Sequence, residues 1–99
     1  MTNLIELTIL RGVVEKFIDK LLSDKSLSTS RIIFDNMKPA IKNSDDAIFG
    51  YIYGTVLGKL DTIYANFNRQ PTDEEIKEIV NAIQKRTIEI RSRIYETKT

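Results

Sequence analysis

The chain has 99 residues, enough for one domain with a single hydrophobic core and too few for two. With 41% hydrophobic and 29% charged residues, its composition excludes wholesale disorder and a membrane protein. Its formal net charge of +1 excludes an overall positive potential that would attract nucleic acid non-specifically. The absence of cysteine and histidine excludes disulfides, thiolate or imidazole metal sites and cysteine or histidine catalysis, so we expect no enzymatic activity, no metal and no cofactor.

The N-terminal residues lack the features of a targeting signal. From Met1 to Glu6 there is neither a basic region nor a long apolar run, so we expect a cytoplasmic protein. The longest weakly charged run, Ala47 to Leu57, has about half the length needed to cross a bilayer, which predicts no association with a membrane. The isoleucine-rich, cysteine-free composition is compatible with a thermophile or with an AT-rich genome.

Apolar residues spaced by three and four predict an amphipathic helix from Leu4 to Leu22, with charged residues on its other side. Its expected core face consists of Leu7, Leu10, Val14, Phe17 and Leu21. The serine-rich residues 23–30 are interpreted as a polar connection whose hydroxyls are candidate helix caps. In residues 31–42, Pro39 opposes a straight helix, so the second helix is predicted to be short or kinked. Its shared face would be Ile33, Met37 and Ile41.

Two capping signals define the remaining helices. Asn43 is a candidate N-cap, and the acidic residues after it favour a third helix from about Asp45 to Phe67, although its β-branched and aromatic residues leave a strand as the alternative. Thr72 and Glu75 form a capping box that predicts one last helix of about 25 residues. Its expected core face is Ile76, Val80, Ile83, Ile90 and Ile94. The fold class is therefore all-α: one domain, residues 1–99, forming a small antiparallel bundle of four helices with a long C-terminal helix.

The third helix carries small residues at regular intervals along one side. The strip consists of Ala47, Gly50, Gly54 and Gly58. Each glycine costs a helix about 1 kcal/mol relative to alanine, so three glycines cost about 3 kcal/mol that packing must offset. Either the glycines admit a bulky neighbour of the same chain, such as Phe17 or Phe34, or they meet a helix of a second copy or of another protein. A non-helical segment is the third alternative.

Three further groups of side chains are candidates for a function. Tyr51, Tyr53 and Tyr64 are either interface aromatics or half-buried packing residues. The carboxylates of Glu75 and Glu78 have the spacing of a metal-binding pair, although a helix N-terminus also favours acidic residues. The C-terminal basic residues form either a ridge for nucleic acid or a solvated helix end. They are Lys85, Arg86, Arg91, Arg93 and Lys98.

The sequence therefore favours a protein-binding function. The leading hypothesis is a non-enzymatic helical interaction module that forms a homodimer or serves as a small accessory subunit stabilising a larger complex. The alternative is a nucleic-acid-binding or regulatory protein that uses the basic ridge. A metal-assisted hydrolase acting through Glu75 and Glu78 is a third hypothesis, which lacks the second acidic pair that such enzymes need.

Overall fold

The computed structural model describes residues 6–98 and contains only helices, with no strand, over that range. The helices are α1 (Leu7–Leu21), α2 (Asp24–Asp35), α3 (Ser44–Asn66), α4 (Asp73–Lys85) and α5 (Thr87–Glu96). The predicted all-α class is confirmed, whereas the predicted number of four helices is wrong. The start of the first helix that was expected at Leu4 lies outside the described residues.

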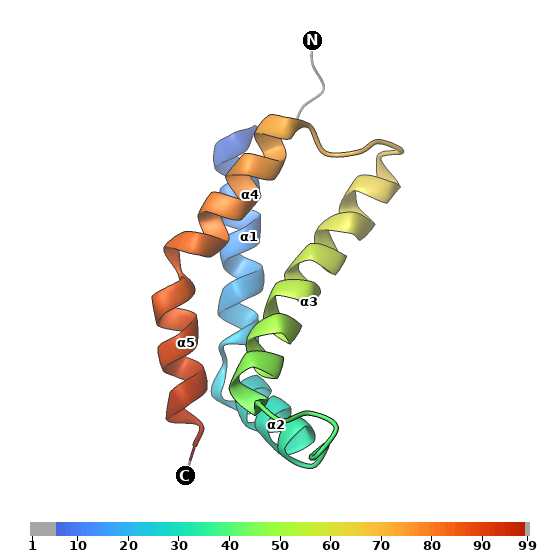
Figure 1. Ribbon diagram of the computed structural model, residues 1–99. Helices are drawn as coiled ribbons and strands as arrows, with labels where there is room; N and C mark the ends of the chain where they lie inside the picture. Colours follow the sequence, from blue (N-terminus) through green and yellow to red (C-terminus); the bar gives the residue numbers. More distant parts are fainter. Residues whose placement is uncertain (1–5, 99) are drawn as a thin grey trace.

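Three of the helices run along the length of the molecule. Figure 1 shows α1 and α4 side by side in the same direction, with α3 running the opposite way, while α2 lies across the end at which α1 and α3 meet. The helix α5 continues from α4 along the same edge and packs mainly against α3. The arrangement is therefore not the regular antiparallel bundle of four helices that the sequence predicts.

The molecule is elongated for its size. The described residues extend over 51 × 23 × 20 Å with a radius of gyration of 15.1 Å, compared with about 13 Å for a compact domain of this length. An elongated chain buries less of its apolar surface than a compact one, which leaves large hydrophobic side chains exposed on several helices. None of the described helices has the length and hydrophobicity that crossing a bilayer requires.

The described residues form one hydrophobic core cluster to which all five helices contribute. In α1, the predicted face is largely confirmed: Leu10 and Val14 are fully buried, and Leu7, Phe17 and Leu21 pack against the cluster. In α3, every fourth residue points inward because successive turns return to nearly the same face. These inward residues are Ile48, Ile52, Val56, Leu60 and Tyr64.

The second helix begins earlier than the sequence predicts. Residues 24–30 are helical, and the hydroxyl of Ser23 caps them by accepting a hydrogen bond of 3.2 Å from the backbone N–H of Ser26. The burial of Leu27 against the core stabilises this first turn, a tertiary contact that the polar local sequence does not reveal. The helix ends at Asp35, and Ile33 and Met37 remain about half exposed.

The predicted C-terminal helix is divided into two at Arg86. The guanidinium of Arg86 lies 2.6 Å from the Asp19 carboxylate of α1 and 2.9 Å from that of Glu89, and it also donates a hydrogen bond to the backbone carbonyl of Glu15. The hydroxyl of Thr87 donates a hydrogen bond to the carbonyl of Ile83, which competes with the regular helical pattern. The break allows α4 to follow α1 while α5 follows α3.

The break also changes which residues of α4 face the core. The prediction was correct for Ile83, Ile90 and Ile94, which are buried, and wrong for Ile76 and Val80, which are 45% and 44% exposed. The buried positions of α4 are instead Glu75, Ile79, Ala82 and Ile83. A single straight helix would bury the same face along its whole length. Because α4 is separate from α5 and packs against α1, it buries a different face from the one that the sequence predicts.

Candidate protein-binding surface

The helix that carries the glycines is well defined at its start. The side-chain oxygen of Asn43 accepts a hydrogen bond of 3.0 Å from the backbone N–H of Asp46, and Asp45 and Asp46 lie in the positive first turn. The helix begins at Ser44 and ends at Asn66, within one residue of the predicted bounds. The segment is therefore helical, and the strand alternative is excluded.

The three glycines lie on the side of α3 that faces away from the core. Gly50, Gly54 and Gly58 are exposed, and a Cβ atom placed on any of them would have no atom of the described chain within 4 Å, apart from those of its neighbours and its own helix backbone. Phe17 lies elsewhere, beneath the Lys59 ammonium, and Phe34 packs edge-on against Tyr51. The hypothesis that these rings fill the strip within the chain is therefore wrong.

Large apolar side chains flank the strip on both sides. Tyr51 and Leu57, three residues before and after Gly54, are 46% and 47% exposed. Beyond Leu57, the half-exposed Ile76 and Val80 of α4 extend the same apolar surface. We define the outer face as these four side chains together with the glycine strip. The sequence pattern did not single out Leu57, although its position off the four-residue stripe of buried residues was the available signal.

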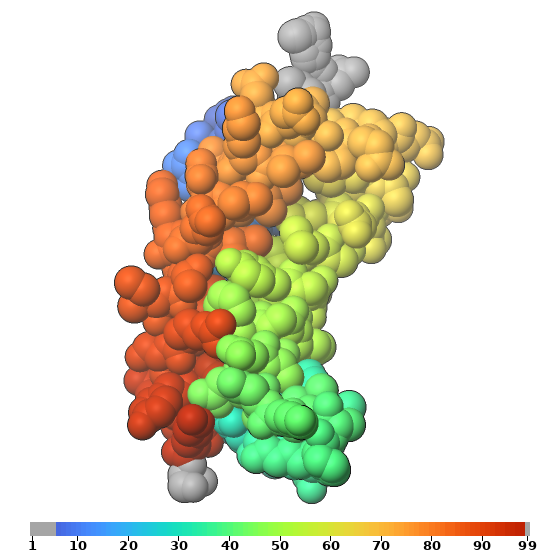
Figure 2. Space-filling view, viewed as in Figure 1, coloured from blue at the N-terminus to red at the C-terminus, as the bar shows by residue number. Residues whose placement is uncertain are grey.

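A shallow apolar groove separates α3 from α4 on this surface. Two adjacent hollows of about 210 and 120 Å³ share Leu57, Ile79 and Val80 as walls. Figure 2 shows the surface hollowed between α4 and α3, where the two helices diverge toward the 67–72 connection. A hollow of this kind, apolar and open to solvent, accepts side chains of a partner helix.

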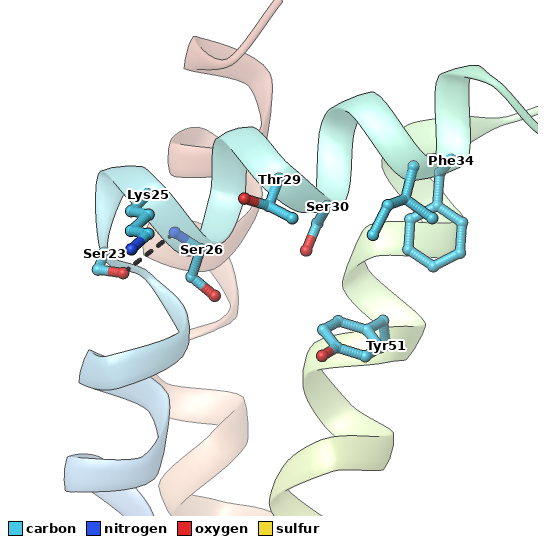
Figure 3. Close-up of a pocket in the computed structure, with 8 residues that line it drawn as sticks. Ser23, Lys25, Ser26, Thr29, Ser30, Phe34 and Tyr51 are labelled. Carbon is cyan, nitrogen blue, oxygen red and sulfur yellow. Dashed lines mark hydrogen bonds between the residues drawn. The ribbon is translucent and has the colours of Figure 1, made fainter.

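A second hollow lies between α2 and α3, next to Tyr51. It has a volume of about 410 Å³, and the hydroxyls of Ser26, Thr29 and Ser30 line its α2 side in Figure 3. Phe34 and Tyr51 form its other wall, with ring centroids 6.1 Å apart. The lining offers a single cation, Lys25, and no general base that activates a hydroxyl.

The three predicted interface tyrosines have different positions. Tyr51 is the exposed one and belongs to the outer face, while the half-buried Tyr53 lines the groove and packs edge-on against Phe49 at 4.6 Å. Tyr64 is only 3% exposed and belongs to the core of α3. The structure therefore brings Tyr51 and Tyr53 to the candidate surface, while Tyr64 contributes only a buried part of the wall of the smaller hollow.

Four of the five predicted basic residues are engaged in ion pairs within the chain. Arg86 pairs with Asp19 and Glu89, and the guanidinium of Arg91 lies 2.7 Å from Asp46 and over the ring of Phe49. Further pairs join Arg93 to Asp24 and Glu96, and Lys98 to Asp45. The hydrogen bond from Arg11 lowers the pKa of Glu78, and the positive charge of Lys85 adds a smaller effect in the same direction. Most of the positive charge of the ridge is therefore balanced by carboxylates of α1, α2 and α3.

The two carboxylates of the predicted acidic pair bind different arginines. Glu78 receives a hydrogen bond of 2.8 Å from Arg11 of α1, whereas Glu75 binds the guanidinium of Arg69 through both oxygens, at 2.8 and 3.0 Å. The capping box is confirmed, because Glu75 also accepts a bond from the N–H of Thr72. The described residues contain no group of three carboxylates that could hold a metal ion.

The buried Glu75 carboxylate is expected to make stability depend on pH. Hydrogen bonds from Arg69 lower the pKa of Glu75 from 4.5 to about 2, against the effect of burial. A carboxyl whose pKa is depressed in the folded state stabilises the fold above its unfolded pKa, so this stability is lost as the pH falls from 4.5 to 2. We expect a loss of about 3 kcal/mol across this window. Urea unfolding at several pH values measures it, and Glu75→Gln should remove this component of the pH dependence.

Comparisons with known proteins give no relatives. No protein-family model matches the chain, and neither a curated protein nor a solved structure matches it. The outer face, with its groove and its three bare helical positions, is the feature that points to a function.

Proposed function

We propose that the chain is a non-enzymatic helical interaction module that binds a helix of a protein partner through its outer face. The partner is either a second copy of the chain or a larger subunit that the chain stabilises. One observation carries this proposal: Gly50, Gly54 and Gly58 are helical and exposed, and no atom of the described chain packs where a Cβ atom would stand.

The energetic cost of the glycines supports this proposal. Three glycines cost α3 about 3 kcal/mol of helix stability relative to alanine, a large part of the 5–15 kcal/mol that stabilises an ordinary domain. Packing within the chain does not offset this cost, because the positions are open. A partner helix offsets it by approaching the bare backbone closely, where it gains dispersion contacts along the seam.

The exposed apolar side chains beside the strip support the same function. Leu57, Ile76 and Val80 each expose nearly half of their surface along one groove. A contiguous apolar patch that is lined by two helices is typical of a site for an amphipathic helix. Burial of these side chains on binding would supply about 25 cal/mol for each Å² removed from water.

The ion pairs of the basic residues favour protein binding over the nucleic-acid alternative. A phosphate backbone would have to compete with Asp19 for Arg86 and with Asp46 for Arg91. The alternative predicts binding to DNA or RNA that is strongly salt-dependent and that weakens when Arg86, Arg91 and Arg93 are replaced by alanine. Negligible retardation of nucleic acid at low salt, before and after these substitutions, would remove it.

Light scattering over a range of concentrations tests the proposed module in the absence of other proteins. A chain of 11.4 kDa that associates with itself is expected to give a mass approaching twice this value as the concentration rises. Affinity capture from native extract tests for another partner, with Gly54→Leu as the control that blocks the outer face. A strict monomer that captures no protein sensitive to Gly54→Leu would overturn the proposal.

A further inference from the structure

Resting on the function proposed above, we infer that the occupant of the outer face is the outer face of a second copy, with the two α3 helices crossing antiparallel about a two-fold axis at Gly54. The surface to be covered is an unpartnered apolar helix face, since Tyr51 and Leu57 are both nearly half exposed beside the bare backbone. The positions of its large and bare residues along α3 decide which partner it fits.

The large and the bare positions of this face alternate around Gly54. With a rise of 1.5 Å per residue, Tyr51 and Leu57 lie about 4.5 Å from Gly54 along the axis, and Gly50 and Gly58 lie about 6 Å from it. Each residue turns the helix by about 100°. Relative to the line that runs through Gly54 parallel to the helix axis, Tyr51 and Gly58 therefore lie on one side. Leu57 and Gly50 lie on the other side. Each side therefore presents one large residue and one bare position, at opposite ends.

An antiparallel two-fold crossing matches these positions with each other. The two-fold axis reverses the direction of α3 but preserves its two sides, so Tyr51 of the second copy falls over Gly58, and Leu57 of the second copy falls over Gly50. Gly54 faces Gly54 of the second copy at the crossing point. A surface whose large residues fit its own bare positions has the self-complementarity that an isologous dimer requires.

The position of Asp61 distinguishes the antiparallel crossing from a parallel one, in which the large residues would also meet glycines. Ala47, Gly54 and Asp61 follow one another at intervals of seven residues, so they lie on one line along the helix. Asp61 is exposed. A parallel crossing would place the two Asp61 carboxylates next to each other in a poorly hydrated seam, where like charges repel. The antiparallel crossing places Asp61 opposite the small Ala47 and opposes the two helix dipoles, so the charge pattern favours it.

Single-cysteine variants test this arrangement, because the natural chain contains no cysteine. Ala47→Cys and Asp61→Cys are prepared separately and treated with a short bismaleimide, alone and as an equimolar mixture. The antiparallel crossing predicts a cross-linked heterodimer in the mixture, at about tenfold the yield of Ala47→Cys alone, because this pair is held at high effective concentration. Gly12→Cys, on the exposed side of α1, reports random collision.

Each result of this experiment decides one point. Strong cross-linking of Ala47→Cys with itself, a variant that keeps Asp61, would establish a parallel pair and overturn the antiparallel register. Yields equal to that of Gly12→Cys in every sample, together with a monomeric mass, would overturn the second copy as the occupant. In that case, capture of another protein that Gly54→Leu abolishes would leave the proposed module intact, so the two failures are distinguishable.

Discussion

Replacing Glu75 with alanine is expected to destabilise the fold by about 3 kcal/mol, one of the two largest effects that we predict. The substitution removes a carboxylate that is completely buried and that binds both the Arg69 guanidinium and the N–H of Thr72. It also leaves a cavity beside the ring of Tyr64, over which Arg69 lies at 5.0 Å. Urea unfolding at pH 7 measures the loss as a shift of the midpoint.

The double substitution provides the control for this prediction. Arg69 is partly exposed, so its guanidinium can become hydrated when Glu75 is removed. The expected loss of stability therefore lies at the lower end of the values for broken buried ion pairs. Arg69→Met combined with Glu75→Leu replaces both charges with apolar side chains of similar size and should restore part of the stability. A loss below about 1 kcal/mol for Glu75→Ala would show that the pair contributes no more than an exposed one.

Replacing Gly54 with leucine is expected to abolish association while slightly stabilising the monomer. The added side chain points to open space in the single chain and improves helix propensity by about 0.8 kcal/mol. In the associated state it meets the partner backbone, and overpacking of 1–3 kcal/mol for each of the two substituted helices weakens a dimer by about 30-fold or more. Sedimentation velocity at several concentrations measures the loss.

Gly12 offers a matched control for Gly54. It is also helical and exposed, and a Cβ atom placed on it has no atom of the described chain within 4 Å, apart from those of its neighbours and its own helix backbone. Gly12→Leu should therefore stabilise α1 by a similar amount and leave association unchanged. Equal sedimentation behaviour of the Gly12→Leu and Gly54→Leu proteins would contradict a specific role for the strip.

Local signals predicted the parts of the fold that local interactions determine. The N-cap at Asn43 and the capping box at Thr72 and Glu75 lie where the sequence indicates, since each needs only backbone groups three residues away. The core face of α1 followed from its spacing. The prediction failed where distant residues decide the structure, as at Arg86, whose partner Asp19 is far away in the sequence.

The candidate surface was predicted in part. The spacing of Gly50, Gly54 and Gly58 identified the strip, but sequence alone could not tell whether Phe17, Phe34 or a partner covers it, because this depends on how α1 and α2 cross α3. The groove was not predicted, since Ile76 and Val80 fit a helical core pattern as well as Ile79 and Ile83 do. The rotation of α4 on α1 separates the two sets.

The concentration dependence of thermal unfolding tests most directly whether another backbone covers the outer face of α3. Unfolding of the unsubstituted, Gly12→Leu and Gly54→Leu proteins is followed at low and high protein concentration. A self-associating outer face predicts a midpoint that rises with concentration for the first two proteins, since association stabilises the folded state by mass action, and a constant midpoint for Gly54→Leu. A constant midpoint for all three proteins, with both leucine variants equally stabilised, would contradict a second copy as the occupant of the outer face.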